Sequence, residues 1–319
     1  DAREGDSILI QLRRNQQITS VSGIVVGLRK INSQYYDAIY DWVSFKGGKL
    51  RVIIKKPVGR TNTPAILYIP EYPCWGLDAF QANNYQLLTD AWVKKGFSVI
   101  YTEKVGLGDN ENTISCGEAD FATEIETFEA GYEYMQNLSF IDSSNLFIYG
   151  HGIGGVIASQ IAERRSPKGV IVFGTYFRPW SEMWLDRLRL HNFWMKRDIP
   201  TMEYTLQKIA PEVFFRFFKK KEHPDSLYKH DLFRKFMQTY MAYSNTSKQI
   251  LGRNWKYWQQ LEEHPIAKIW ANTNAYALVL YGEKDYDAYS KNDHELIQET
   301  IESYHPGAST FITFPNSTH

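Results

Sequence analysis

The segment that most constrains the fold of this chain is residues 145–160, with the sequence NLFIYGHGIGGVIASQ. Its first part is apolar and rich in residues that favour strands, its middle holds four glycines, and its last part is small or aliphatic. A strand that passes through a glycine turn directly into a helix is the repeating unit of a parallel sheet. The segment therefore predicts one strand and one helix of an α/β fold.

Further apolar runs of strand length recur along the chain, at residues 50–54, 65–70, 97–102, 169–174, 275–282 and 310–314. Several of them are separated by stretches with helical spacing, such as residues 84–95 and 121–137. Near-continuous apolar strands that alternate with helices indicate a parallel sheet covered on both faces. The predicted fold class is α/β, with a doubly wound, mostly parallel central sheet.

Two segments depart from this alternation. Residues 1–45 show β-type alternation without a clear helix, which predicts a β-rich antiparallel N-terminal extension. Residues 180–272 contain no strand candidate, whereas helix-like stretches repeat at 181–197, 202–218, 227–243 and 248–261. We therefore expect a helical insertion between two strands of a core formed by residues 46–179 and 273–319.

The composition excludes several classes of protein. The 36 Lys+Arg residues balance the 36 Asp+Glu residues, whereas surfaces that bind nucleic acids or anionic membranes carry an excess of positive charge. No apolar stretch approaches the roughly 20 residues of a membrane-spanning helix. The two cysteines, Cys74 and Cys116, lack C-x-x-C spacing and cannot form a metal site alone. We expect no nucleic-acid partner, no membrane span and no bound metal, and the sequence indicates no oligomeric state.

The motif that bears on chemistry is residues 150–154, GHGIG, between the predicted strand and helix. It fits the nucleophile-elbow pattern G-x-S-x-G, except that a glycine stands at the central position. The flanking glycines have a physical role, because side chains there would collide with the neighbouring strand and helix. The stretch also fits the dinucleotide-binding pattern G-x-G-x-x-G. That alternative is weaker, because the motif follows three or four strands instead of the first one.

The chain resembles the α/β-hydrolase fold family in motifs that occur in the family's order. Besides the elbow, these are the glycine-containing loop 104–109, Asp285 after the strand at 275–281, and His319 after the last strand. The resemblance covers roughly residues 50–179 and 273–319. It implies an α/β-hydrolase core and places residues 180–272 at the position of the family's helical cap.

The resemblance implies a catalytic triad with one member missing. Gly152 stands at the position of the nucleophile, where a serine is expected, while Asp285 is the orienting acid and His319 the base. A serine hydroxyl needs such an imidazole to remove its proton, and the carboxylate holds the imidazole in the correct tautomer. Asp287 and Asp293 are alternatives for the acid.

The family's oxyanion hole consists of two backbone N–H groups, which the resemblance assigns to Ile153 and Tyr72. Pro73 has no N–H, which leaves Tyr72 as the donor from the loop after the strand at 65–70. Glu71 stands where the family usually has a glycine. The Glu71 side chain either contacts the substrate or points to solvent.

Aromatic side chains of this sequence are candidates for contact with the substrate, although for any single one core packing is favoured. Substrate contacts are expected for Glu71, His151, Trp75, Trp180 and Trp184, with His151 packed at the floor of the pocket. Helices of the cap would roof the pocket, and the candidates for its aromatic lining or packing are Trp180, Trp184, Trp194, Phe214, Phe215, Phe218, Tyr240, Trp255 and Trp258. An aromatic roof suits an apolar acyl group, because it excludes water.

The glycine at position 152 leaves three explanations open. With a serine there, the resemblance implies cofactor-free acyl transfer on an ester, thioester or amide of a small-molecule or peptide substrate. In this first explanation, the glycine is an engineered replacement of that serine, and this chain is expected to be inactive. Alternatively, the chain is a natural non-catalytic relative that binds an acyl ligand or a peptide, or it uses the sheet differently, as a dinucleotide-binding protein would. The first explanation is favoured, because the acid, the histidine and the flanking glycines are all retained.

The two cysteines bear on the cellular compartment. In the α/β-hydrolase fold, the loops that carry Cys74 and Cys116 follow adjacent central strands and meet at one edge of the sheet, so the resemblance implies a disulfide between them. Two buried thiols are the alternative. A disulfide predicts an extracytoplasmic, periplasmic or secreted protein, whereas free thiols predict a cytoplasmic one.

Overall fold

The structure is a computed structural model that describes residues 5–14, 17–25, 33–76, 84–194, 199–285, 287 and 290–319. Within these ranges, the side chains of residues 190–194, 199, 201 and 202 are not described. The expected roof residue Trp194 therefore has a described backbone only.

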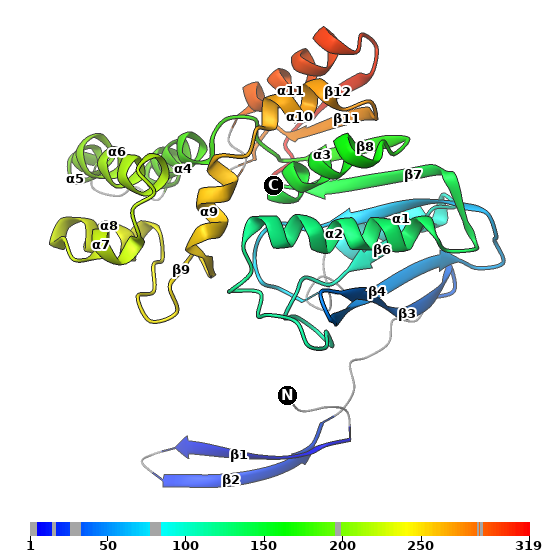
Figure 1. Ribbon diagram of the computed structural model, residues 1–319, viewed down its shortest axis with the longest axis horizontal. Helices are drawn as coiled ribbons and strands as arrows, with labels where there is room; N and C mark the ends of the chain where they lie inside the picture. The colour runs from blue at the N-terminus through cyan, green and yellow to red at the C-terminus, as the bar shows by residue number, and fades with distance from the viewer. Residues whose placement is uncertain are drawn as a thin grey trace.

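The described part of the chain contains a central sheet of eight strands in the order β12-β11-β8-β7-β5-β6-β4-β3 (Figure 1). Its strands are β3 (Tyr36–Phe45), β4 (Gly48–Pro57), β5 (Thr63–Ile69), β6 (Ser98–Thr102), β7 (Ile141–His151), β8 (Gly169–Phe173), β11 (Tyr276–Gly282) and β12 (Ser309–Phe314). All neighbours from β6 to β12 pair in parallel, while β4 pairs antiparallel with both β3 and β6. The predicted α/β fold with a mostly parallel sheet is confirmed.

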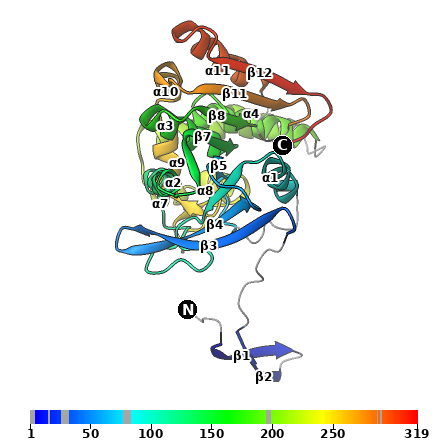
Figure 2. The ribbon, with the colours of Figure 1, turned by 90° about the vertical axis from the view of Figure 1, so that its right-hand side faces the viewer.

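Helices cover both faces of this sheet, and successive residues of its central strand β5 contribute to different cores. On β5, Ala65 and Leu67 join one hydrophobic core and Ile66 and Tyr68 join another. The first core packs under helices from different parts of the chain: α2 (Phe121–Gln136), α3 (Ile153–Arg165), α10 (Ile266–Asn272) and α11 (Lys291–Tyr304). The second core packs under α1 (Asn84–Lys94) (Figure 2). The expected doubly wound arrangement is present.

The segment between β8 and β11 is mainly helical. Besides α10, its helices are α4 (Trp180–Trp194), α5 (Ile199–Tyr204), α6 (Ala210–Phe214), α7 (Pro224–Tyr228), α8 (Asp231–Tyr240) and α9 (Trp255–Glu262), with π-helical turns at Thr205–Ile209 and Phe215–Lys219. The expectation that it holds no strand is wrong at one point. The short strands β9 (Gln249–Ile250) and β10 (Arg253–Asn254) pair around Leu251 and Gly252, both with positive φ, so the helix expected at 248–261 starts only at Trp255.

The N-terminal residues form an antiparallel hairpin of β1 (Ser7–Arg14) and β2 (Gln17–Ile24). In Figures 1 and 2 this hairpin lies apart from the central sheet. The β-rich extension was expected to reach residue 45, but β3 is the edge strand of the central sheet and pairs with β4 along its whole length. Tyr36 and Phe45, at the two ends of β3, are buried. The alternating pattern of this segment therefore reflects packing of β3 in the core instead of a separate extension.

No helix among the described residues is long and apolar enough to cross a membrane. Within the same residues, no three His, Cys, Asp or Glu side chains lie together as a metal ion would require.

The contact between β7 and α3 gives the first testable prediction. A Cβ on Gly150 would lie 2.6 Å from the Gly155 Cα and would also overlap the Gly154 carbonyl. Because backbone atoms cannot move aside as a flexible side chain can, Gly150→Ala should lower the free energy of unfolding by about 1–3 kcal/mol. Denaturant titration measures this, with Gly76→Ala as control, since the nearest atom to a Cβ on Gly76 lies at 3.9 Å. Equal stability of the two variants would contradict the close strand–helix packing.

Candidate active site

The predicted elbow is present between β7 and α3. Gly152 separates the two elements and has φ 56° and ψ −122°, in the region where glycine is strongly preferred over other residues. A Cβ on Gly154 would lie 2.5 Å from the Ile69 carbonyl oxygen of the adjacent strand β5. The glycines on either side of Gly152 are therefore required for the close approach of strand and helix, as the sequence predicted.

Asp285 and His319 lie in the loops that follow β11 and β12, and their side chains are paired. The His319 Nδ1–H donates to the Asp285 carboxylate, with Nδ1 at 3.0 Å from Oδ1 and 2.9 Å from Oδ2. The expected pairing is confirmed, and the two alternative acids have other partners: Asp287 pairs with Arg187 and Asp293 with Arg178.

Space and charge both favour the pairing of Asp285 with His319. A Cβ on Gly174 would lie 2.8 Å from both Asp285 Oδ2 and His319 Nδ1, so the glycine after β8 leaves the space that the pair occupies. Burial disfavours the charged imidazole, but the hydrogen bond and the charge of Asp285 outweigh it and raise the pKa of His319 above its ordinary value. A protonated His319 is therefore stabilised by its neighbour.

The Glu71 side chain occupies the space where the side chain of an elbow nucleophile would lie. Its Oε2 accepts a hydrogen bond of 2.7 Å from the Ile153 backbone N–H. A Cβ built on Gly152 would overlap Glu71 Oε2, because the two atoms would be only a covalent-bond length apart. The same Cβ would lie 3.0 Å from Oε1. Of the two alternatives for Glu71, orientation toward solvent is therefore wrong. The carboxylate lies in the elbow and on the N–H expected to form the oxyanion hole.

The charge state of this centre depends on burial. Burial raises the pKa of Glu71, and the charges of His319 and Lys104 together with the Ile153 N–H oppose that shift. Burial and the neighbouring His319 lower the pKa of His151 to about 3, so His151 is neutral near neutral pH. The His151 ring lies 4.3 Å from that of His319, and its Nδ1 hydrogen-bonds the Tyr85 hydroxyl at 3.1 Å.

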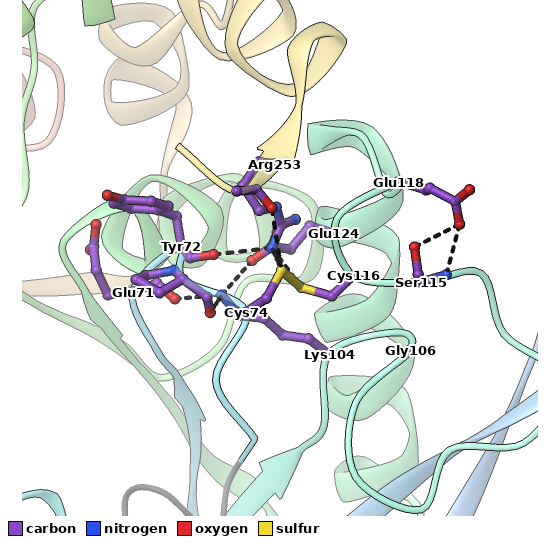
Figure 3. The surroundings of a disulfide bond; sticks show 12 residues. Glu71, Tyr72, Cys74, Lys104, Gly106, Ser115, Cys116, Glu118, Glu124 and Arg253 are labelled. Atoms are coloured by element: carbon purple, nitrogen blue, oxygen red, sulfur yellow. Dashed lines mark hydrogen bonds and ion pairs between the residues drawn. A yellow bond between two sulfur atoms is a disulfide. The ribbon is translucent and has the colours of Figure 1, made fainter. Parts of the chain in front are cut away.

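The loop that carries Glu71 is held by a disulfide and a cluster of buried ions (Figure 3). Cys74 and Cys116 are disulfide-bonded, with their Cα atoms 5.8 Å apart, which confirms the predicted bond. Arg253 of β10 donates to the Tyr72 carbonyl at 3.0 Å and to Cys116 Sγ at 3.1 Å. The helical segment therefore contacts the disulfide and the loop after β5 directly.

Lys104 and Glu124 complete this cluster (Figure 3). Lys104 pairs with Glu124 at 2.9 Å and donates to the carbonyls of Glu71 and, at 3.3 Å, Pro73. Arg253 also pairs with Glu124, so one buried carboxylate neutralises two buried cations in part. Burial lowers the pKa of Lys104, and Glu124 counteracts this effect. The backbone from Glu71 to Pro73 is therefore anchored to the core.

A cavity of about 260 Å³ lies above Gly152. The predicted site residues that line it are Glu71, Tyr72, Trp75, His151, Gly152, Ile153, Trp180 and His319, and Asp285 lies behind His319. Trp184 is not among the residues that line it, and its expected substrate contact stays a prediction. Its ring packs behind that of Trp180, at 5.7 Å, and against Trp258, because the helical segment needs large side chains for its own core.

Several lining residues were not predicted from the sequence. They are Pro73, Tyr85, Gly174, Tyr176, Met183, Arg187 and Asp287. Gly174 and Tyr176 follow β8 directly, so the rule that ligands bind at the carboxyl ends of parallel strands could have identified them. Met183 and Arg187 lie on α4 with Trp180 at helical spacing, which is a weaker signal. Of the expected roof aromatics, Phe214, Phe218 and Trp258 are buried in packing, whereas Phe215 is exposed.

The elbow between β7 and α3, with an Asp–His pair at the ends of the following strands, defines the α/β-hydrolase fold. Residues 79–300 match the family model described as serine aminopeptidase, S33. Because this match covers more than half of the chain, the protein belongs to that family of α/β-hydrolases.

Individual relatives are distant. The chain is 23% identical over 159 residues to the esterase EstD of Thermotoga maritima, a match that covers 50% of this chain but only 31% of that relative. Among solved structures, Est1E from Butyrivibrio proteoclasticus has a TM-score of 0.56 at 13% identity, covering 88% of this chain and 90% of that one. DcsB in complex with its substrate analogue has a TM-score of 0.56 at 14% identity, covering 89% and 91%. At such identities the structural similarity shows the fold alone.

The disulfide gives the second prediction. The two cysteines are 42 residues apart in the sequence, and cross-linking a loop of that length stabilises a protein by about 4 kcal/mol in the chain-entropy model. Cys74→Ser/Cys116→Ser should lower the free energy of unfolding by roughly that amount, as reduction of the unmodified protein should. Denaturant titration with and without reductant measures both effects. The serine variant should not respond to reductant, and an unmodified protein equally stable with and without reductant would contradict the prediction.

Proposed function

We propose that the cavity above Gly152 binds a small molecule in which an apolar group is attached to a carbonyl, and that acyl transfer there requires a serine at position 152. The observation that carries this proposal is that His319, paired with Asp285, lines the same cavity as Gly152 and Ile153. The family to which the chain belongs, described by its serine aminopeptidases, supports a substrate with an ester or amide carbonyl.

The roles of the residues follow from the chemistry of acyl transfer. With a serine at position 152, His319 would accept the proton of the hydroxyl and Asp285 would stabilise the resulting imidazolium. The Ile153 N–H, with the Tyr72 N–H, would donate to the oxyanion of the tetrahedral intermediate. Gly152 supplies no attacking oxygen, so the present chain should form no acyl-enzyme on the elbow. Ester, thioester and amide substrates all suit this arrangement.

The position of Glu71 supports the view that Gly152 is natural to this protein. A serine side chain at position 152 would overlap the Glu71 carboxylate unless Glu71 turned away. An engineered replacement of a serine would leave the rest of a serine hydrolase unchanged, including a free oxyanion hole. Here the Ile153 N–H is bonded to Glu71. We therefore propose that glycine at position 152 and glutamate at position 71 occur together, in a relative that does not use serine.

The disulfide between Cys74 and Cys116 supports an extracytoplasmic location. Disulfides persist in oxidising compartments and are rare in the cytoplasm.

The third prediction tests the acyl-transfer scaffold. Gly152→Ser alone should react poorly with a fluorophosphonate probe, because the Glu71 carboxylate would hold the Ile153 N–H and repel a developing oxyanion. Gly152→Ser/Glu71→Ala should react at least about 100-fold faster, since an oxyanion-hole donor contributes roughly 10²–10³ to the rate. Mass spectrometry of the labelled protein over time measures the difference.

The control for this experiment is Gly152→Ser/Glu71→Ala/His319→Ala. It should not be labelled, because the serine would lack its base. Circular dichroism shows whether each variant is folded. A folded double variant that remains unlabelled, and inert toward esters, thioesters and amides, would overturn the proposal that this site carries out acyl transfer when a serine is present.

A further inference from the structure

One carboxylate oxygen of Glu71 accepts a hydrogen bond from the protein, and the other can accept one from a ligand or a proton. Oε2 accepts from the Ile153 N–H, whereas Oε1 makes no hydrogen bond with any described residue, and Glu71 lines the cavity. Loop contacts fix the Glu71 backbone, since Lys104 donates to its carbonyl oxygen. The site therefore presents to a ligand a carboxylate oxygen, Oε1, that lies 3.0 Å from where a Cβ on Gly152 would be, while Oε2 occupies the place of a serine side chain.

A carboxylate at this position disfavours acyl transfer by the present chain. The tetrahedral intermediate of acyl transfer places a negative oxygen on the backbone donors of the oxyanion hole. Here one of those donors already binds an anion, and a second negative charge beside it would be repelled. The reaction that a fixed carboxylate carries out most directly is the removal of a proton.

The cavity also contains polar groups without partners. Among the described residues, the Tyr176 hydroxyl, the Trp180 Nε1 and the His151 Nε2 are buried and make no hydrogen bond. All three residues line the cavity and are at most 4% exposed. Leaving such groups unpaired is costly, so they mark where a ligand's polar atoms would bind.

The chemistry of these groups selects an oxygen acceptor. The indole N–H of Trp180 can only donate, and the Tyr176 hydroxyl can donate as well as accept. When His151 Nδ1 accepts from the Tyr85 hydroxyl, Nε2 carries the hydrogen and becomes a third donor. These donors are neutral, so they suit a carbonyl oxygen and would stabilise the charge that an enolate places on it.

We propose that Glu71 is the catalytic base of a proton-transfer reaction on a small carbonyl compound with a hydrogen on the carbon next to the carbonyl. This inference rests on the proposed ligand class and adds a reaction to it. The C–H bond breaks, its proton moves to Glu71 Oε1, and the electron pair moves through the carbon onto the carbonyl oxygen. The resulting enolate accepts hydrogen bonds from Tyr176 and Trp180.

The reaction closes with water as its only further reactant. The proton on Glu71 exchanges with water, and the enolate then takes a proton back on carbon from Glu71, which regenerates the carbonyl compound and the carboxylate. If the imidazolium of His319 donates instead, the proton on Glu71 returns to His319 through water. Exchange of the hydrogen with solvent, or isomerisation, is the net result. Asp285 and His319 also have a role in this scheme. Asp285 stabilises the positive charge of His319, and that charge favours the ionised, basic form of Glu71.

The fourth prediction tests this reaction by hydrogen exchange in D₂O. The unmodified protein is incubated with phenylacetone and with ethyl 3-oxo-3-phenylpropanoate, and loss of the α-hydrogen signal is followed by proton NMR against buffer alone. Exchange should be faster with the protein, and Glu71→Gln should slow it by about 100-fold or more, as loss of a general base does. Glutamine can still accept from the Ile153 N–H through its carbonyl oxygen, so the fold should be retained.

A matched control and a binding measurement separate the possible failures. Glu263→Gln, on an exposed carboxylate paired with Lys221, should leave the exchange rate unchanged. Tyr176→Phe should slow exchange without abolishing binding, which saturation-transfer NMR measures for both probes. Probes that bind without exchange above buffer would overturn the reaction but leave the proposed ligand class intact.

Three other results would also overturn the inference. Failure of both probes to bind would remove the proposed ligand class, and the inference with it. Exchange that is unchanged in Glu71→Gln would exclude Glu71 as the base. A covalent ester on the Glu71 peptide, detected by mass spectrometry after incubation with a probe, would indicate nucleophilic attack by the carboxylate instead of proton transfer.

Discussion

The contact between the Glu71 carboxylate and the bare Cα of Gly152 determines the rest of this site. Any side chain at position 152 would overlap Glu71, and without Glu71 the Ile153 N–H would lack the partner that it has here. The positive φ of Gly152 and the space that Glu71 needs both favour glycine. Two positions 81 residues apart by their numbers are therefore coupled through a single contact.

That contact depends in turn on a buried ion cluster behind the loop. Lys104 and Arg253 each donate to a backbone carbonyl of the loop and each pair with Glu124. Burying two cations is costly unless partners offset the loss of water, and here one carboxylate and several carbonyls supply most of those partners, although Arg253 Nε has none among the described residues. Because Arg253 comes from β10 of the helical segment, packing of that segment on the core also fixes the loop that carries Glu71.

The features that the sequence predicted well are those set by local pattern and chain order. Continuous apolar runs predicted the parallel strands, and the positions of Asp285 and His319 after β11 and β12 predicted their pairing. What it missed depends on tertiary contacts. The orientation of Glu71 follows from the missing Cβ of Gly152, and the alternation in β3 did not show that its partner would be β4. Large aromatics such as Trp184 could equally line a pocket or fill a core.

The arrangement of strands explains how a carboxylate from another loop can replace an elbow side chain. Strands β5 and β7 are neighbours, and Ile69 pairs in register with Gly150, so both chains leave the sheet at the same level. Glu71 lies two residues after Ile69 and Gly152 two residues after Gly150, which puts the two positions opposite each other. His319 lines the same cavity as both of them. In our proposal, the fold keeps its histidine and its backbone donor while the reacting oxygen moves from the turn after β7 to the loop after β5, and the chemistry changes from acyl transfer to proton transfer.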